Sequence, residues 1–131
     1  MSAPFKASLI TPEAILFETS VVFAQIPVFD GLVGILDKRA PLLAKLGTGI
    51  LRLDTAPNTS QRFLVVGGYA QIKGDELTIL TTEAIPAKQI TQETIASEQA
   101  KLATVKGIDL KAMEQRSAIE ARIYAMRNLV S

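Results

Sequence analysis

The chain has 131 residues, which is enough for one ordinary domain and a small appendage. It contains neither cysteine nor histidine, which excludes disulfides, thiolate nucleophiles, the usual zinc ligands and the commonest general base near neutral pH. The formal net charge of +1 argues against nucleic acid as a partner, because a nucleic-acid-binding face is strongly basic. Apolar residues make up 48% of the chain but aromatic residues only 5%, so we expect a dense aliphatic core.

No apolar run in the sequence approaches the about 20 residues that a membrane-spanning helix needs. The N-terminus also lacks the basic region and apolar core of a secretory signal. We therefore expect a cytoplasmic-type soluble chain, which would associate with a membrane only through a partner.

Short β-type runs separated by turn residues fill the chain from about residue 5 to residue 80. Such spacing predicts an antiparallel β-sandwich or flattened barrel. The polar stretch 56–60 predicts a hairpin loop, and Gly67-Gly68 predicts a bulge or close backbone packing. The expected strands are 5–10, 14–17, 21–26, 32–36, 42–46, 50–53, 63–66, 69–73 and 76–80.

Residues 64–66, Leu-Val-Val, are apolar at consecutive positions rather than at alternate ones. A strand with this pattern is covered on both faces. We therefore expect another element to dock on the outside of the sandwich at this strand.

The composition changes after Pro86, where Ala, Glu, Gln, Lys and Arg take over from glycine and the β-branched residues. Thr91 suits a helix N-cap, Gly107 a C-terminal stop and Asp109 a second N-cap. The sequence therefore predicts an α+β chain. We expect a β-sandwich domain at 1–86, followed by an αα-hairpin at 87–131 with helices at about 91–106 and 109–129.

The second helix is expected to carry two apolar stripes. One packs on the first helix and the other on the sandwich in a resting structure; alternatively, the basic-flanked stripe also serves an acidic partner. The main stripe holds Ala112, Ile119, Ile123, Met126 and Val130, flanked by Lys111 and Arg122 on one side and by Arg116 and Arg127 on the other. The weaker stripe holds Leu110, Met113, Ala121 and Tyr124.

No catalytic constellation is found in the sequence. Gly47-Thr48-Gly49 lies in a strand-rich region with no helix after it, so we interpret it as a turn rather than a phosphate loop. The acidic residues are scattered, which leaves a carboxylate-only hydrolase without paired acids. We expect no cofactor and no metal.

The stretch 29–49 instead indicates a partner-facing edge, because it sets Leu42 and Leu43 beside the basic pair Lys38-Arg39.

Three motifs resemble the epsilon subunit of F-type ATP synthases, and they follow the family's order along residues 5–85. They read LITPEAILFE at 9–18, IPVFDGLVGILDKRAPLLAKLGTGILRL at 26–53 and FLVVGGYAQIKGDELTIL at 63–80. The resemblance implies a non-catalytic rotor subunit of the central stalk. It further implies a peripheral position on the cytoplasmic face of the inner membrane, with the membrane reached only through the complex.

The resemblance also implies partners. The sandwich would contact the gamma subunit and the c-ring, and the hairpin would either fold on the sandwich or rise along gamma and obstruct ATP hydrolysis. Contacts of the raised hairpin with the catalytic alpha and beta subunits would involve Lys111, Arg116, Arg122 and Arg127. The matching ring-facing and gamma-facing residues are Phe29, Asp30, Gly31, Arg39, Ala40, Pro41, Leu42 and Leu43.

The chain departs from the family pattern at two places. Arg39-Ala40-Pro41 stands where the family usually has His-Ala-Pro, and arginine cannot titrate as histidine does. Residues 90–95 lack the aspartate and arginine of the family's ATP-binding motif, so we expect no ATP sensing. The alternative interpretation from a different class is a free-standing β-sandwich that binds a small ligand or nucleotide, with the hairpin as a lid.

Overall fold

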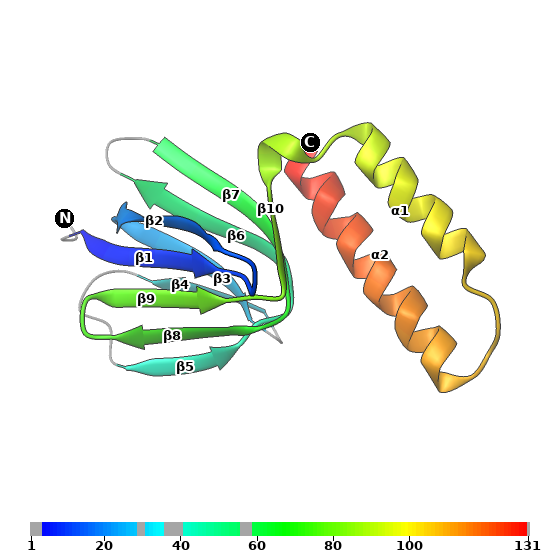
Figure 1. Ribbon diagram of the computed structural model, residues 1–131, viewed down its shortest axis with the longest axis horizontal. Helices are drawn as coiled ribbons and strands as arrows, with labels where there is room; N and C mark the ends of the chain where they lie inside the picture. Colours follow the sequence, from blue (N-terminus) through cyan, green and yellow to red (C-terminus); the bar gives the residue numbers. More distant parts are fainter. Residues whose placement is uncertain (1–3, 29–30, 36–40, 56–58, 131) are drawn as a thin grey trace.

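The computed structural model describes residues 4–28, 31–35, 41–55 and 59–130. Within these ranges, ten strands form two five-stranded sheets, followed by a 3₁₀ turn and two helices (Figure 1). The elements are β1 (Phe5–Ile10), β2 (Ile15–Val21), β3 (Phe23–Val28), β4 (Gly31–Ile35), β5 (Leu42–Lys45), β6 (Thr48–Thr55), β7 (Thr59–Val66), β8 (Tyr69–Lys73), β9 (Glu76–Leu80), β10 (Glu83–Pro86), η1 (Ala87–Gln89), α1 (Gln92–Thr104) and α2 (Leu110–Val130).

The two sheets confirm the predicted sandwich. One sheet has the strand order β2-β1-β9-β8-β5 and the other β10-β7-β6-β3-β4. All strand pairs are antiparallel except β1 with β9, which run parallel. Alternate residues of both sheets fill an aliphatic core, in which the largest fully buried side chains include Leu9, Ile26, Leu51, Leu53 and Ile79.

A second apolar cluster joins the helical hairpin to the outer face of β6 and β7. Leu64 points from β7 into this cluster, whereas its neighbours Phe63 and Val65 point into the sandwich core. The consecutive apolar residues of this strand are therefore buried on both faces, as the sequence predicts. Ile95 of α1 and Met126 of α2 are buried against the same cluster.

Capping residues set where the helices begin. Thr91 and Thr94 form a reciprocal capping box at the start of α1, with each backbone N–H donating to the other's hydroxyl. Asp109 accepts a hydrogen bond from the backbone N–H of Ala112 at the start of α2, at 3.2 Å. The N-cap predictions are thus confirmed. The first helix ends at Thr104, before the predicted stop at Gly107, because Val105 has an extended backbone.

Packing of the second helix differs from the expectation of two buried stripes. The main stripe is buried or half-buried, as predicted. The prediction that the weaker stripe also packs on another element is wrong, because Leu110, Met113 and Tyr124 are 71%, 53% and 72% exposed. The helix α2 instead uses one wide face, which also includes Ala125 and Leu129, for both α1 and the sheet.

Gly68 confirms the prediction of close backbone packing at the glycine pair. Its φ is +110°, and a Cβ atom built there would overlap the carbonyl oxygen of Leu80 and approach the Cα of Thr81 to 2.7 Å. This contact lies where the chain passes from β9 in one sheet to β10 in the other. The Thr81 hydroxyl donates to the carbonyl of Gly67 at 2.7 Å and fixes the same corner.

Candidate interaction surfaces

An exposed apolar row crosses the outer face of the sheet β2-β1-β9-β8-β5. The strand registers pair Ile15 with Ile10, Ile10 with Leu80, and Leu80 with Tyr69. Side chains at paired positions point to the same face of a sheet, so these four form a continuous row, which we call the apolar row. These side chains lie on the solvent side of the sheet, where Ile15, Leu80 and Tyr69 are 50–61% exposed.

The edge strand β5 continues this surface. Leu43 pairs with Gln71 and Lys45 pairs with Tyr69, which places both β5 side chains on the same outer face as the apolar row. Leu43 is 69% exposed, and beside it Pro41, Leu42 and Ile72 line a shallow hollow.

The predicted partner-facing residues are only partly placed by the structure. Gly31 begins β4, and Pro41 directly precedes β5, which contains Leu42 and Leu43 and lies in the opposite sheet. Phe29, Asp30, Arg39 and Ala40 lie outside the described residues.

The apolar row itself was missed at the sequence level. Its signal was present, because Leu9-Ile10, Ile15-Leu16 and Ile79-Leu80 are consecutive apolar pairs at strand ends. In each pair one side chain must point away from the core of a two-layer sandwich.

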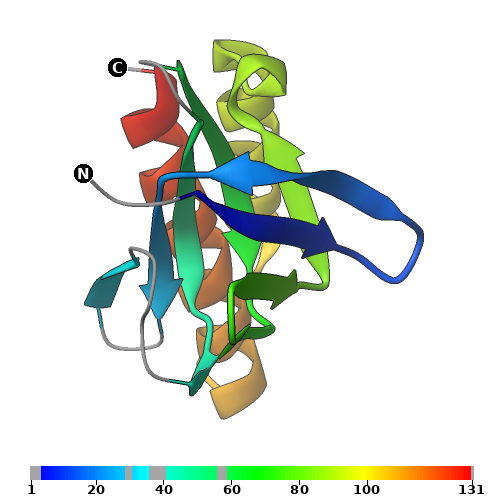
Figure 2. The same cartoon turned by 90° about the vertical axis from the view of Figure 1, so that its left-hand side faces the viewer.

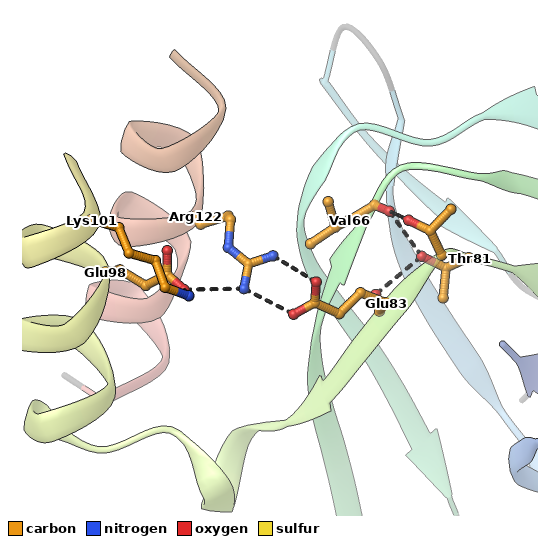
Figure 3. Close-up of polar contacts among 7 residues, drawn as sticks. Val66, Thr81, Glu83, Glu98, Lys101 and Arg122 are labelled. Atoms are coloured by element: carbon orange, nitrogen blue, oxygen red, sulfur yellow. Dashed lines mark hydrogen bonds and ion pairs between the residues drawn. The ribbon is translucent and has the colours of Figure 1, made fainter. Parts of the chain in front are cut away.

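A buried ionic clamp fastens the hairpin to the sandwich (Figure 3). The guanidinium of Arg122 on α2 donates two hydrogen bonds to the carboxylate of Glu83 on β10, at 2.8 and 2.9 Å. It donates a third to Glu98 on α1, at 3.3 Å, and Lys101 also pairs with Glu98 at 3.4 Å. We call the set of Arg122, Glu83 and Glu98 the ionic clamp. It joins the last strand and both helices.

Burial makes the clamp more costly to break than a surface ion pair. The side chain of Arg122 is 16% exposed and that of Glu98 is 7% exposed, whereas Glu83 remains half-exposed. Screening by water is weak at this depth, and removal of one partner leaves the other charge without compensation. The hydrogen bonds and charge of Glu83 raise the pKa of Arg122, and Arg122 in turn lowers the pKa of Glu83.

The lowered pKa of Glu83 predicts an acid-sensitive contribution to stability. A carboxyl group with a lower pKa in the folded state stabilises the fold above its unfolded pKa, which is about 4.3 for glutamate. This contribution disappears as the pH falls through the lower folded value. We expect Glu83→Gln to flatten the loss of unfolding free energy below about pH 4.5. Urea titrations at several pH values would measure the unfolding free energy of both proteins. The same decrease below about pH 4.5 in both would contradict the prediction.

The other predicted basic residues of α2 occupy different surroundings. Arg116 donates to the carbonyl of Gly107 at 2.8 Å and thereby holds the turn between the helices. Lys111 and Arg127 are exposed, and within the described ranges no ion pair involves either of them. Arg122 lies inside the buried face of the helix rather than at its flank, so in this docked arrangement it is not available to another subunit.

Two other kinds of site are not found among the described residues. Among the described residues, no group of three or more acidic side chains lies close enough together to hold a metal ion. In the same part of the chain, no helix has both the length and the apolar composition for a membrane crossing. The arrangement is a β-sandwich with an exposed apolar face, joined to a helical hairpin through a second small core.

Comparison with known proteins gives the family. Residues 4–87 match the β-sandwich domain of the ATP synthase delta/epsilon chain, and the chain belongs to this family. The ATP synthase epsilon chain of Granulibacter bethesdensis is 31% identical over 128 residues, which cover 92% of this chain and 95% of that one. The epsilon chain of Rhodopirellula baltica is 40% identical over 78 residues, 60% of each chain. The resemblance read from the three sequence motifs is confirmed.

A solved structure agrees with the fold. A chain of the Euglena gracilis mitochondrial ATP synthase, in an assembly of OSCP, F1 and c-ring, superimposes with a TM-score of 0.87. The superposition covers 100% of this chain and 84% of that one, at 19% sequence identity. The sandwich and the docked hairpin are therefore shared with a chain of very different sequence.

Proposed function

We propose that this chain is the non-catalytic rotor subunit of an F-type ATP synthase, which links the gamma subunit to the c-ring at the cytoplasmic face of the membrane. Family membership supports a place in the synthase, and the similar Euglena chain comes from an assembly with F1 and the c-ring. The lack of cysteine and histidine fits a subunit that transmits torque instead of catalysing a reaction.

The apolar row is the observation that carries this proposal. Exposed apolar side chains on four adjacent strands form a contiguous patch, and such patches mark interaction sites. A sheet face is also rigid, which suits a contact that has to transmit force. We assign the apolar row to gamma and, by resemblance, Pro41, Leu42 and Leu43 at the start of β5 to the c-ring.

Co-assembly with gamma tests the proposal directly. The purified chain is expected to co-elute with gamma in size-exclusion chromatography. Leu80→Asp is expected to weaken the affinity at least tenfold, because a charge would be buried at the centre of the interface. Ile108→Asp is the matched control, since Ile108 is 92% exposed but lies in the hairpin turn. Failure of the unaltered chain to bind gamma would contradict the proposal.

The hairpin is proposed to act as a brake on ATP hydrolysis when it leaves the sandwich. Ending the chain after Pro86 is expected to preserve coupled synthesis and to raise the ATP hydrolysis rate of the reconstituted synthase several-fold. The truncation exposes Leu64, so a Leu64→Ser version of the shortened chain controls for aggregation. An unchanged hydrolysis rate, with the shortened subunit present in the complex, would show that the hairpin is not a brake in this protein.

A further inference from the structure

The helical hairpin covers only part of the sheet on which it docks. The helix α2 contacts β6 and β7, and α1 lies on the far side of α2, toward β10. At the other end of this sheet, no helix among the described residues lies over the outer face of β4, and β3 lies at the margin of α2 (Figure 2). The helical layer of the molecule therefore ends at β3.

A groove of about 590 Å³ lies in this position, between α2 and the outer face of β3 and β4. Pro27 and Leu32 face each other across the two strands and form part of its floor with Ile50 of β6. Tyr124, Ala125 and Asn128 form the wall on α2. Leu32 and Tyr124 are 62% and 72% exposed, so the groove presents large apolar groups to solvent.

The dimensions of the uncovered strip fit one α-helix. Two neighbouring strands span about 10 Å, because strands in a sheet lie about 4.8 Å apart. Helices in a layer pack with their axes 8–10 Å apart, so the strip beside α2 has the width of one further helix. An extended segment would fill only half of it.

The outward face of α2 has the composition of a helix–helix contact. Leu110, Met113, Ser117, Ala121 and Tyr124 follow one another at spacings of three and four residues, which places them on one side of the helix. Small residues in the middle let a second helix approach closely, and larger apolar residues at the ends provide buried area. This stripe continues directly into the wall of the groove at Tyr124.

The charges in the groove specify the occupant further. Arg52 and Arg62 stand opposite each other on β6 and β7, and both line the groove. Arg52 is already neutralised by two hydrogen bonds to Asp54, at 2.8 and 2.9 Å. No ion pair in the described part of the chain involves Arg62, which is exposed. Arg62 is therefore the cation in the groove that an occupant's carboxylate could pair with.

We infer that the groove between α2 and the β3–β4 face is a docking site for one amphipathic α-helix of a neighbouring subunit, which places its apolar side on Leu32 and Tyr124 and a carboxylate on Arg62. The inference rests on the proposed function in one respect: it assumes that the partner is another subunit of the synthase. The groove and the apolar row lie on the outer faces of opposite sheets, so the two sites can be tested separately.

Site-specific photo-crosslinking in the intact synthase tests the inference. We would introduce p-benzoylphenylalanine at Leu32 for the groove, at Tyr69 for the apolar row and at Glu93, exposed on α1, as a control. The groove probe is expected to crosslink to one segment of another subunit, mapped by mass spectrometry, with apolar residues every three or four positions and an acidic residue. In the same probe-bearing chain, Arg62→Glu is expected to reduce the yield at least fivefold, whereas Ile108→Asp leaves it unchanged.

The outcomes separate this inference from the proposed function. Crosslinking at Tyr69 without crosslinking at Leu32 would overturn the docking site and leave the rotor assignment intact. Crosslinks from Leu32 to a second copy of the chain, or to a segment without helical spacing, would also overturn it. Absence of the chain from the purified synthase would contradict the proposed function instead. A crosslinking yield that does not change with Arg62→Glu would contradict the proposed contact between Arg62 and a carboxylate.

Discussion

Replacing Arg122 with methionine is expected to lower the free energy that docks the hairpin onto the sandwich by about 3 kcal/mol. Methionine keeps most of the side-chain volume, but it leaves the carboxylate of Glu98 buried with only the exposed Lys101 nearby. The clamp acts in addition to the second apolar cluster, which also holds the hairpin on the sheet. Hydrogen exchange of the α1 and α2 amides would measure the change, as roughly a hundredfold loss of protection.

A double variant distinguishes the clamp from simple packing. Arg122→Met with Glu98→Leu removes both buried charges, and we expect protection to return to within about tenfold of the unaltered chain. The β7 amides should keep their protection throughout, because the sandwich core does not include the clamp. Equal losses in the single and the double variant would show that the uncompensated carboxylate of Glu98 is not the cause of the loss.

Replacing Gly68 with alanine is expected to destabilise the sandwich by about 3 kcal/mol or more. The positive φ strains any residue with a side chain, and the added methyl group would meet the backbone of Leu80 and Thr81, which cannot rotate away. Because these residues connect the two sheets, relief of the overlap requires a shift of one sheet edge. Urea denaturation followed by circular dichroism would show a lower midpoint with an unchanged slope.

Gly74 provides the matched control for this substitution. It also has a positive φ, of +62°, but a Cβ atom built there meets nothing within 4 Å. We therefore expect Gly74→Ala to cost only about 1 kcal/mol, the penalty for the left-handed backbone. Similar losses in the two variants would mean that backbone conformation, rather than the close approach at Gly68, limits both positions.

The sequence alone determined the architecture, because each of its signals is local. Turn residues between β-type runs identified the sandwich, and Thr91 and Asp109 identified the starts of both helices. The apolar run at 64–66 even indicated that something docks outside β7. Strand ends were less predictable: β6 and β7 extend to Thr55 and Thr59 as a polar, solvent-exposed hairpin, which carries no hydrophobic pattern.

Only the tertiary structure decided what the charged and outward-facing residues do. Periodicity placed Arg122 beside an apolar stripe. It could not show that Glu83 and Glu98, 39 and 24 residues away in the chain, converge on its guanidinium. Equally, an apolar stripe on α2 or at the end of β9 looks the same in sequence whether it is buried or exposed. Burial depends on which elements pack together, and the pattern of one element does not identify its partner.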